Sequence, residues 1–381
     1  EITTRLVGSE MCIRDRCIFS SELLKIAEEK RKIGGNMGII GRHSFELCSR
    51  PRIISSASYV GDKEGKGPLR ECFDKICRDD TLGLDSWEQA ESRMFESAVR
   101  VALAKIKRQS DDLSCLLGGD LLNQIISSGF AAREIRAPFI GLYGACSTIS
   151  EGLMLGGMLV DGGFAELAAC AASSHFSAAE RQFRYPLEMG VQAVPSSQRT
   201  VTGAGSIIIQ AAGEFRPGAG NVFEHVALTG GTIGSVEDFG ITDANNMGAA
   251  MAPAAFKTIK THLSDYSRRV EDYDRIITGD LGIFGSDMLY ELLRGEGIEI
   301  ADRHEDCGKL MFSPEQNVNC GASGCGCAAT VMSSWFLPKI ESGEIRRVLF
   351  LATGALMSPV SSLQGESIPS IAHAVVIEHI D

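Results

Sequence analysis

The chain has 381 residues, of which 44% are hydrophobic and 23% charged, a composition typical of a globular protein with a sizeable core. This length favours two core-forming halves over one core. The net charge of −12 at pH 7 argues against a nucleic-acid partner and against electrostatic adhesion to anionic lipid. No window of about 18 uninterrupted apolar residues is present, so the sequence predicts no transmembrane segment.

The N-terminus and the cysteines need separate treatment. Residues 1–36 are predicted to be an artefactual or disordered extension, because residues 6–16 resemble a translated sequencing adapter and Met37 is the expected start. The twelve cysteines follow no secretory signal, and we expect buried free thiols in a reducing compartment. Cys320, Cys325 and Cys327 lie close together, but a zinc site normally pairs two such clusters, so we expect no metal there.

From residue 50 onward, segments with strand and helix patterns alternate. In chain order we predict a strand at 53–60, a helix at 87–108, a strand at 115–117, helices at 124–133 and 148–160, and strands at 167–172 and 206–210. Residues 214–220 contain Pro217 with several glycines and alanines, which predicts a crossover to the rest of the chain.

The second half then repeats the order of the first. Residues 112–121 match residues 272–281, which pairs Asp120 with Asp280. Gly-Ala-Cys-Ser at 144–147 matches Gly-Ala-Ser-Gly at 321–324, which pairs Cys146 with Ser323. Matches in the same order indicate a duplication. We therefore predict an α/β protein with two pseudo-symmetric halves, residues 37–213 and 221–381, and sheets stacked with helices between and outside them.

Cys146 is the first candidate for chemistry. It follows an apolar strand pattern at 139–143 and precedes the long apolar helix, so a tight turn is expected to place its thiol at a helix N-terminus. Backbone N–H groups and the helix dipole favour a thiolate or a bound anion at such a position. The alternative is a buried structural cysteine in a turn, which is common.

A strand, a cysteine and a buried helix in the first half of a duplicated α/β chain resemble the thiolase and β-ketoacyl synthase superfamily. The chain further resembles the stage V sporulation protein AD family from Arg52 to Glu378. The motifs that carry this resemblance are Gly-Asp-Leu-Leu-Asn-Gln at 119–124, Gly-Ala-Cys-Ser-Thr at 144–148, Ser-Ser-His at 173–175 with Ala-Glu-Arg-Gln-Phe-Arg-Tyr-Pro at 179–186, Gly-Ile-Thr-Asp at 240–243, Met-Ala-Pro-Ala-Ala at 251–255 and Thr-Gly-Ala-Leu at 353–356. The resemblance implies a thiolase-like fold with α-β-α-β-α layers.

Condensing enzymes of this superfamily keep a His and a second His or Asn on two loops of the second half. Here Asp280 stands near the first expected position, and Ser323 or a glycine stands near the second. A carboxylate accepts hydrogen bonds and repels an enolate, and a hydroxyl does not relay protons as imidazole does. We therefore expect no condensing activity. A thiolase-like or β-ketoacyl synthase-like acyltransferase that uses Cys146 with unusual partners is the alternative, and a shifted alignment would bring His304 or His373 to the expected histidine position.

Further candidates for binding an anion are two histidines and two arginines. His175 and His373 fall at predicted strand ends, where α/β sheets gather ligands, although a structural role is the commoner one. Arg181 and Arg184 share a helix face, and one guanidinium pointing inward suits a dicarboxylate. Their alternative is a surface ion pair with Glu180. Asp120 and Asp280 are also candidates for capping the helices that follow them.

The resemblance implies a sporulation protein that binds dipicolinic acid, with calcium bound through that ligand and no cofactor of its own. It implies uptake of this molecule into the forespore and its release at germination, together with the SpoVA membrane proteins. The expected location is the cytoplasmic side of the inner membrane of the forespore and spore, peripheral and held through partners. A homodimer is expected by analogy with thiolases. The expected ligand-binding residues are Cys146, His175, Arg181, Asp280, Ser323 and His373.

Overall fold

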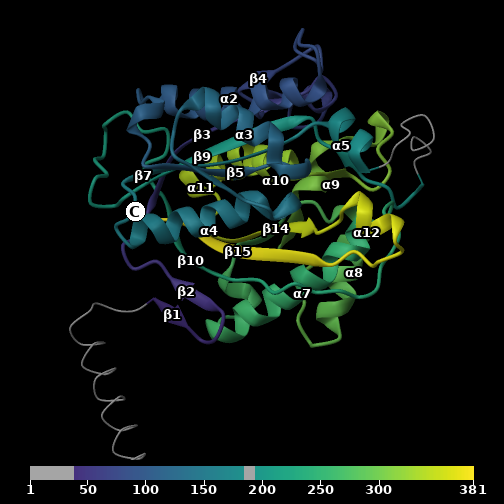
Figure 1. The fold of residues 1–381 in the computed structure, drawn as a ribbon. Coiled ribbons are helices and arrows are strands. Elements are labelled where there is room, and N and C mark those ends of the chain that lie inside the picture. Colours follow the sequence, from purple (N-terminus) through teal and green to yellow (C-terminus); the bar gives the residue numbers. More distant parts are fainter. Residues whose placement is uncertain (1–37, 184–193) are drawn as a thin grey trace, which may run out of the picture. The chain divides into compact units, whose positions relative to one another are not determined.

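A long, twisted sheet organises the chain in the computed structural model, which describes residues 38–183 and 194–381 (Figure 1). Ile40–Asp381 form one unit. The strands are β1 (Ile39–Ile40), β2 (Ser44–Glu46), β3 (Arg52–Val60), β4 (Lys75–Ile76), β5 (Cys115–Gly119), β6 (Phe139–Gly141), β7 (Leu167–Ser174), β8 (Arg199–Thr200), β9 (Gly203–Gln210), β10 (Val226–Thr232), β11 (Arg275–Thr278), β12 (His304–Asp306), β13 (Ala322–Ser323), β14 (Arg347–Ala355) and β15 (Ser370–His379).

Helices of very different lengths connect these strands. The α-helices are α2 (Trp87–Lys105), α3 (Ile126–Ile135), α4 (Thr148–Asp161), α5 (Phe176–Phe183), α7 (Met247–Asp265), α8 (Gly282–Arg294), α9 (Cys307–Met311), α10 (Cys325–Val331), α11 (Leu337–Glu341) and α12 (Pro359–Leu363). A π-helical turn, Met332–Phe336, links α10 to α11. In the part of the chain that the structure describes, no helix is long and apolar enough to cross a membrane.

The order of strands shows the duplication directly. The first half has the order β6-β5-β7-β9-β3 and the second has the order β12-β11-β14-β15-β10. In both halves the outer three strands pair in parallel and the inner ones pair antiparallel. The halves meet where β3 pairs antiparallel with β10, through Arg52 opposite Ala227. The predicted pseudo-symmetric α/β fold is confirmed, and the boundaries at residues 213 and 221 stay a prediction.

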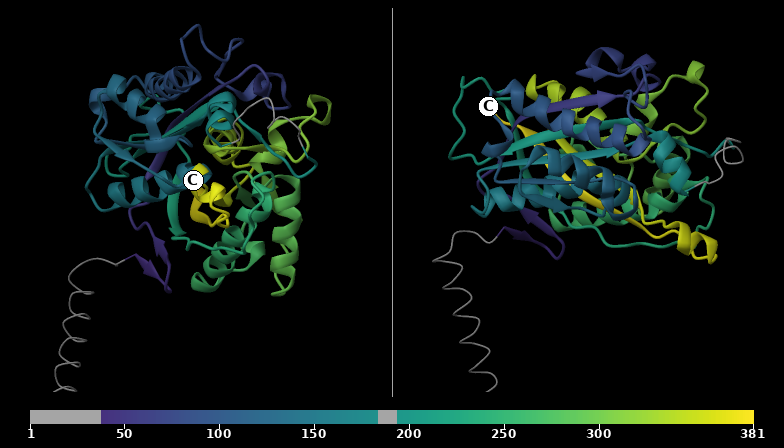
Figure 2. Two further views of the ribbon diagram at one scale, coloured as in Figure 1. Left: turned by 45° about the vertical axis from the view of Figure 1, so that its right-hand side comes forward. Right: turned by 45° about the horizontal axis from the view of Figure 1, so that its top comes forward.

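Five layers follow from the faces that the helices cover (Figures 1 and 2). Helices α2 and α3 pack on the outer face of the first half, where they form one core with β3, β7 and β9. Helices α7 and α8 pack with β11, β14 and β15 on the outer face of the second half. Helices α4 and α10 lie between the two half-sheets and contribute to the largest core. The predicted α-β-α-β-α arrangement is therefore present.

The position of α4 explains its composition. A helix covered by sheets on two sides is apolar over most of its surface, as the sequence of α4 is. Small residues let it approach β7 closely, since a Cβ at Gly156 would lie 2.9 Å from the sulfur of Cys170. Strand β7 is itself buried at every position, and its residues are alanines, serines, one leucine and one cysteine. Small side chains are what this strand needs between two layers of helices.

The predicted elements of the first half correspond to observed ones with shifted ends. The strand expected at 53–60 is β3, and the helix expected at 148–160 is α4. The helix expected at 124–133 begins later, at Ile126, because Gln124 and Ile125 have left-handed backbone angles, with φ of 59° and 46°. Residues 214–220 form no helix or strand, as expected for a crossover.

Candidate ligand-binding site

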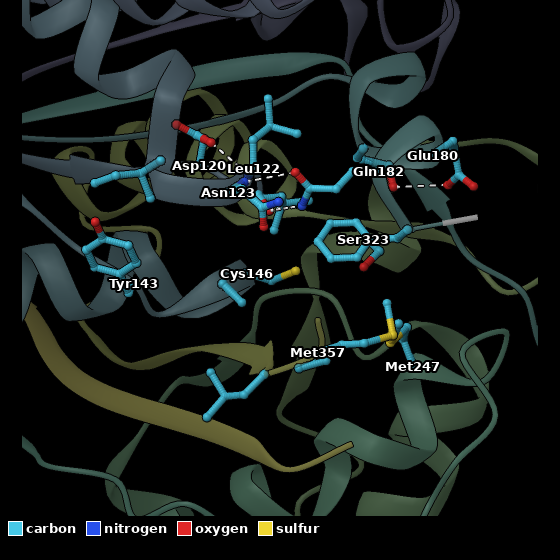
Figure 3. A pocket seen from close by; sticks show the side chains of 18 of the residues that line it. Asp120, Leu122, Asn123, Tyr143, Cys146, Glu180, Gln182, Met247, Ser323 and Met357 are labelled. Atoms are coloured by element: carbon cyan, nitrogen blue, oxygen red, sulfur yellow. Dashed lines mark hydrogen bonds between the residues drawn. The ribbon is translucent and has the colours of Figure 1, made fainter. Parts of the chain in front are cut away.

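A cavity of about 320 Å³ lies between the two halves, near the N-terminal ends of α4 and α10. Its wall includes the loop after β5, helix α5, strand β8, the start of α7 and the residues after β14. Figure 3 shows the Cys146 sulfur pointing into this space, with Asn123 and Gln182 on one side and Met247 and Met357 on the other. Segments far apart in the sequence thus form one pocket around a thiol.

Cys146 has the position that the sequence predicts. A 3-10 turn, Ala145–Ser147, leads directly into α4. Ala145 has a left-handed backbone angle, with φ of 49°, so the chain turns sharply just before the cysteine. The preceding Gly144 leaves no room for a side chain, since a Cβ there would lie 2.3 Å from Glu151 Oε2. This tight turn holds the thiol at the helix N-terminus, facing the cavity.

The expected thiolate is wrong, however. Burial raises the pKa of the Cys146 thiol well above its ordinary value, and the neighbouring Asp280 carboxyl raises it further. The N–H of Gly324 opposes that rise only in part. The thiol therefore stays protonated at neutral pH, beside the Asp280 carboxyl. A helix N-terminus lowers the pKa of a thiol, but here burial and the Asp280 carboxyl raise the pKa of Cys146 by more.

Asp280 is the centre of the polar contacts beneath this cavity. Its carboxyl accepts hydrogen bonds from the Ser323 hydroxyl at 2.8 Å, the Gly324 N–H at 2.9 Å and the Thr353 hydroxyl at 2.9 Å. Burial raises the pKa of Asp280, and these hydrogen bonds oppose the rise. Cys146, Asp280 and Ser323, three of the predicted ligand-binding residues, therefore lie together.

The two equivalent aspartates hold different elements. Asp120 accepts hydrogen bonds from the Leu122 N–H and from both the N–H and the hydroxyl of Ser128 in α3, so it stabilises the start of the helix that follows it. Asp280 does not do this for α8, because Asp306 accepts from the first N–H groups there. The capping role proposed for these positions therefore fits Asp120 alone.

Ser323 lines the cavity from β13, which pairs in parallel with β8. Gln198 joins these two strands to the loop of Asp280, because its side-chain amide donates to the backbone oxygens of Asp280 at 2.6 Å and Ala322 at 2.9 Å. Sequence reasoning missed Gln198 and its neighbour Thr200 as cavity residues. No local pattern marks them, since a two-residue strand carries no periodicity.

The histidines do not line this cavity. His175 is buried, and its Nε2 lies 2.8 Å from the backbone oxygen of Asp80. His373 accepts a hydrogen bond from the Gly234 N–H at 3.2 Å, and burial lowers its pKa to about 4. Among the described residues that form the cavity wall, none is a histidine. Their predicted ligand contacts stay untested predictions, but the structure does not bring either ring to Cys146.

Arg181, a predicted ligand-binding residue, does not line the cavity either. Helix α5 turns Glu180 and Gln182 toward the cavity, whereas Arg181 forms an ion pair with Glu88 and lies over the ring of Trp87 at 5.2 Å. Arg184 lies outside the described residues. Gln182 joins α5 to the loop after β5, because its side-chain oxygen accepts from the Asn123 N–H at 2.9 Å. The face of α5 that reaches the cavity carries Glu180 and Gln182, and Arg181 lies on another face.

The cysteines near Cys325 form separate contacts. The Cys325 thiol donates to the backbone oxygen of Ala145 at 2.9 Å, and Cys327 lies 3.5 Å from the oxygen of Gly279. The Cys320 sulfur instead accepts from the Phe284 N–H at 3.2 Å. Across residues 38–183 and 194–381, no group of three or more His, Cys, Asp or Glu side chains is arranged to hold a metal ion.

Comparison with known proteins decides the family. The family model of stage V sporulation protein AD (SpoVAD) matches residues 41–378. The chain is 43% identical to stage V sporulation protein AD of Bacillus subtilis (strain 168) over 343 residues, which cover 90% of this chain and 98% of that protein. This chain belongs to the stage V sporulation protein AD family.

Solved structures show that members of this family share a fold with condensing enzymes. Human mitochondrial 3-ketoacyl-CoA thiolase, solved in complex with CoA, matches with a TM-score of 0.53 at 10% identity, covering 88% of this chain and 99% of that one. The 3-oxoacyl-(acyl carrier protein) synthase III of Pseudomonas aeruginosa PAO1 matches with a TM-score of 0.51 at 12% identity, over 87% and 99%. The chain is therefore a sporulation protein of the SpoVAD family with a thiolase-like fold.

Proposed function

We propose that this SpoVAD-family protein binds dipicolinic acid, pyridine-2,6-dicarboxylate, in the cavity beside Cys146 and does not condense acyl groups. The observation that supports this most directly is the burial of the Cys146 thiol beside the Asp280 carboxyl, because burial first and the carboxyl second raise the pKa of the thiol and keep it protonated. A condensing enzyme needs a thiolate and a group that moves protons. In this cavity the thiol and Ser323 are instead polar contacts for a ligand.

The charge of the cavity wall points to the form in which the ligand binds. Its described residues include two carboxyls, Asp120 and Glu180, and neither lysine nor arginine. A bare dianion in such a place has no opposite charge to offset the loss of its hydration. A complex of dipicolinate with one Ca²⁺ is neutral, and a planar aromatic ring suits a wall rich in apolar side chains such as Leu122, Met247 and Met251. Calcium therefore enters as part of the ligand.

Calorimetry on the full chain tests this proposal. Dipicolinate in the presence of Ca²⁺ is expected to bind with a stoichiometry of one, and to bind at least about tenfold more weakly when calcium is absent. Replacing Tyr143 at the cavity by Ala should weaken binding, whereas Tyr59→Ala, a change of the same size away from the cavity, should not. Absence of heat at millimolar ligand with and without calcium contradicts the proposal.

A second candidate function is acyl transfer through Cys146, favoured by the position of its sulfur at the end of a helix and facing an open cavity. In that reaction the sulfur attacks the thioester carbonyl of acyl-CoA, the acyl group forms a new thioester with Cys146, and CoA leaves as its thiol. Incubation with acyl-CoA followed by intact mass measurement separates the two functions. An acyl adduct that disappears in Cys146→Ala supports the transferase, and an unmodified mass supports the binding protein.

We infer that the protein acts at the inner membrane of the forespore and spore through the SpoVA membrane proteins, taking part in the uptake of dipicolinate and its release at germination. A homodimer is supported by β6, which ends the sheet and carries the partly exposed Ile140. Light scattering tests the dimer, with Ile140→Lys expected to give monomers. Co-purification of the SpoVA proteins with the tagged chain from solubilised forespore membranes tests the partners, and failure to recover them contradicts this part.

A further inference from the structure

A second cavity, of about 360 Å³, lies on the other side of strand β8 from the Cys146 cavity. Successive side chains of a strand point to opposite faces. Thr200 accordingly lines the Cys146 cavity, and Arg199 lines the second one. Lys63, from the loop after β3, and Arg78, which follows β4, line it as well. Three cationic side chains from three separate segments therefore meet in one hollow.

Arg199 is near the carboxyls of Glu64, Glu180 and Asp80, which raise its pKa, but it forms no ion pair with any of them among the described residues. Its guanidinium carbon lies 3.6 Å from the centre of the Phe176 ring, so the ring covers one face of the group. Its Nε is buried and has no hydrogen-bond partner in the part of the chain that is described. Burial lowers the pKa of this guanidinium. A desolvated cation with an unused donor is costly unless an acceptor comes to it.

Lys63 and Arg78, the other two cations of this cavity, do not offset the cost of burying the Arg199 guanidinium. Within residues 38–183 and 194–381, no ion pair is formed by any of the three cations, Lys63, Arg78 and Arg199. Burial lowers the pKa of Lys63, and the positive charge of Arg199 lowers it further. An anion placed between Lys63 and Arg199 would offset this repulsion.

The carboxyls of this cavity are mostly engaged elsewhere. Asp62 forms an ion pair with Lys66, and Asp79 accepts the N–H groups of residues that follow it in a turn. Glu64 accepts from the Thr202 N–H at 3.1 Å, and burial raises its pKa to about 7, so part of it is neutral at neutral pH. Asp80 remains as an exposed carboxylate at the edge. With Asp62 paired to Lys66, the three cations therefore face the charges of Asp79 and Asp80 and the partly neutral Glu64, which leaves a small positive balance.

We propose that this cavity binds a tetrahedral oxyanion, the phosphate group of a small molecule or free phosphate, between Lys63, Arg78 and Arg199. Cations that approach from three segments surround a group with oxygens in several directions better than they surround a flat carboxylate. The guanidinium of Arg199, fixed against Phe176, supplies paired N–H donors to two of those oxygens. This site is separate from the proposed dipicolinate site and does not depend on it.

Titration of the full chain with inorganic phosphate at low ionic strength, followed by ³¹P NMR and calorimetry, tests this site. Saturable binding to one site is expected, weakened at least about tenfold in Arg199→Gln and in Arg78→Gln. Arg78 is exposed, so its variant keeps the test valid if Arg199→Gln fails to fold. Arg93→Gln, which removes the same charge from the exposed side of α2, is the matched control and should bind as the wild type does.

Binding measurements with other anions identify the ligand and show which results would overturn the proposal. Phenyl phosphate that binds more tightly than free phosphate supports a small molecule as the source, and equal or weaker binding supports the free ion. Acetate that binds as tightly as phosphate overturns the assignment to a tetrahedral anion. Absence of saturation up to about 20 mM phosphate, or an equal loss in Arg93→Gln, shows that binding is unspecific and overturns the site.

Discussion

The hydroxyl of Ser323 donates to Oδ2 of Asp280 at 2.8 Å, and the same carboxyl raises the pKa of the neighbouring Cys146 thiol. Two equivalent turns of the duplicated chain, one carrying Cys146 and one carrying Ser323, thus share an acid that belongs to the second half. The carboxyl accepts hydrogen bonds from Ser323 and Gly324 just before α10, and it raises the pKa of the thiol at the start of α4.

The first prediction concerns the stability that Asp280 provides. Asp280→Asn places an NH₂ group against donors from Ser323, Gly324 or Thr353, so at least one buried donor loses its acceptor. We expect the free energy of unfolding to fall by about 2–3 kcal/mol, measured by urea denaturation. Asp287→Asn, on the exposed side of α8, is the control and should change little. An equal effect of both changes would mean that Asp280 is not held as described.

The second prediction concerns the reactivity of Cys146. Since burial and Asp280 raise the pKa of its thiol, iodoacetamide at pH 8 should alkylate Cys146 at least about tenfold more slowly than it alkylates glutathione. The rate should still be rising above about pH 9. Peptide mass spectrometry over a pH series measures it. A rate that levels off below neutral pH would show a stabilised thiolate and would remove the argument against condensation.

A third prediction follows from Glu64, whose pKa is raised to about 7 in the folded chain by burial. The folded state therefore holds this proton more tightly than the unfolded chain, whose carboxyl has the ordinary value of 4.5. Stability from this group is complete below about pH 4.5 and is lost as the pH rises through about 7.

Glu64→Gln cannot ionise, so it should gain stability relative to the wild type between pH 5 and pH 8, by an amount on the order of 3 kcal/mol. Denaturation curves of both proteins at the two pH values give this difference. If the free energy of unfolding of the wild type does not fall relative to that of the variant as the pH rises, the raised pKa of the buried Glu64 carboxyl is contradicted.

The fourth prediction compares two glycines. A Cβ at Gly354 would lie 2.2 Å from the backbone oxygen of Gly144, so Gly354→Ala must push β14 away from the turn of Cys146. We expect a loss of about 2 kcal/mol or more. Gly129 lies inside α3 with nothing within 4 Å of an added Cβ, so Gly129→Ala should stabilise the chain by about 0.5–1 kcal/mol. Thermal unfolding of both variants measures this contrast, and a similar shift in both would contradict it.

The fifth prediction concerns Arg181, which the sequence placed among the ligand-binding residues. Its guanidinium is paired with Glu88 outside the cavity wall, so Arg181→Ala should leave the affinity for calcium dipicolinate within about twofold of the wild type. Calorimetry under the conditions used for Tyr143→Ala gives the comparison. A loss of about tenfold would show that α5 rotates when ligand binds.

The sequence predicts the fold and the centre of the site for a physical reason. A duplicated chain repeats its turns, which pairs Ser323 with Cys146 and Asp280 with Asp120, and the resemblance to condensing enzymes puts Asp280 and Ser323 on two loops of one pocket. Prediction from the sequence fails where contacts depend on long-range packing. Gln198 and Ala322 are 124 residues apart and meet only because β8 pairs with β13. Spacing along the chain gives Arg181 a helix face, but packing decides which face of α5 reaches the cavity. The thiolate expectation fails because burial is not visible in local sequence.

A crystal structure of the full chain with calcium and dipicolinate tests the central claim most directly. We predict a planar ligand in the cavity lined by Tyr143, Cys146 and Ser323, with Ca²⁺ on its carboxylates and no bond to the Cys146 sulfur. An empty cavity at saturating ligand, with dipicolinate absent or bound elsewhere on the chain, would contradict the account.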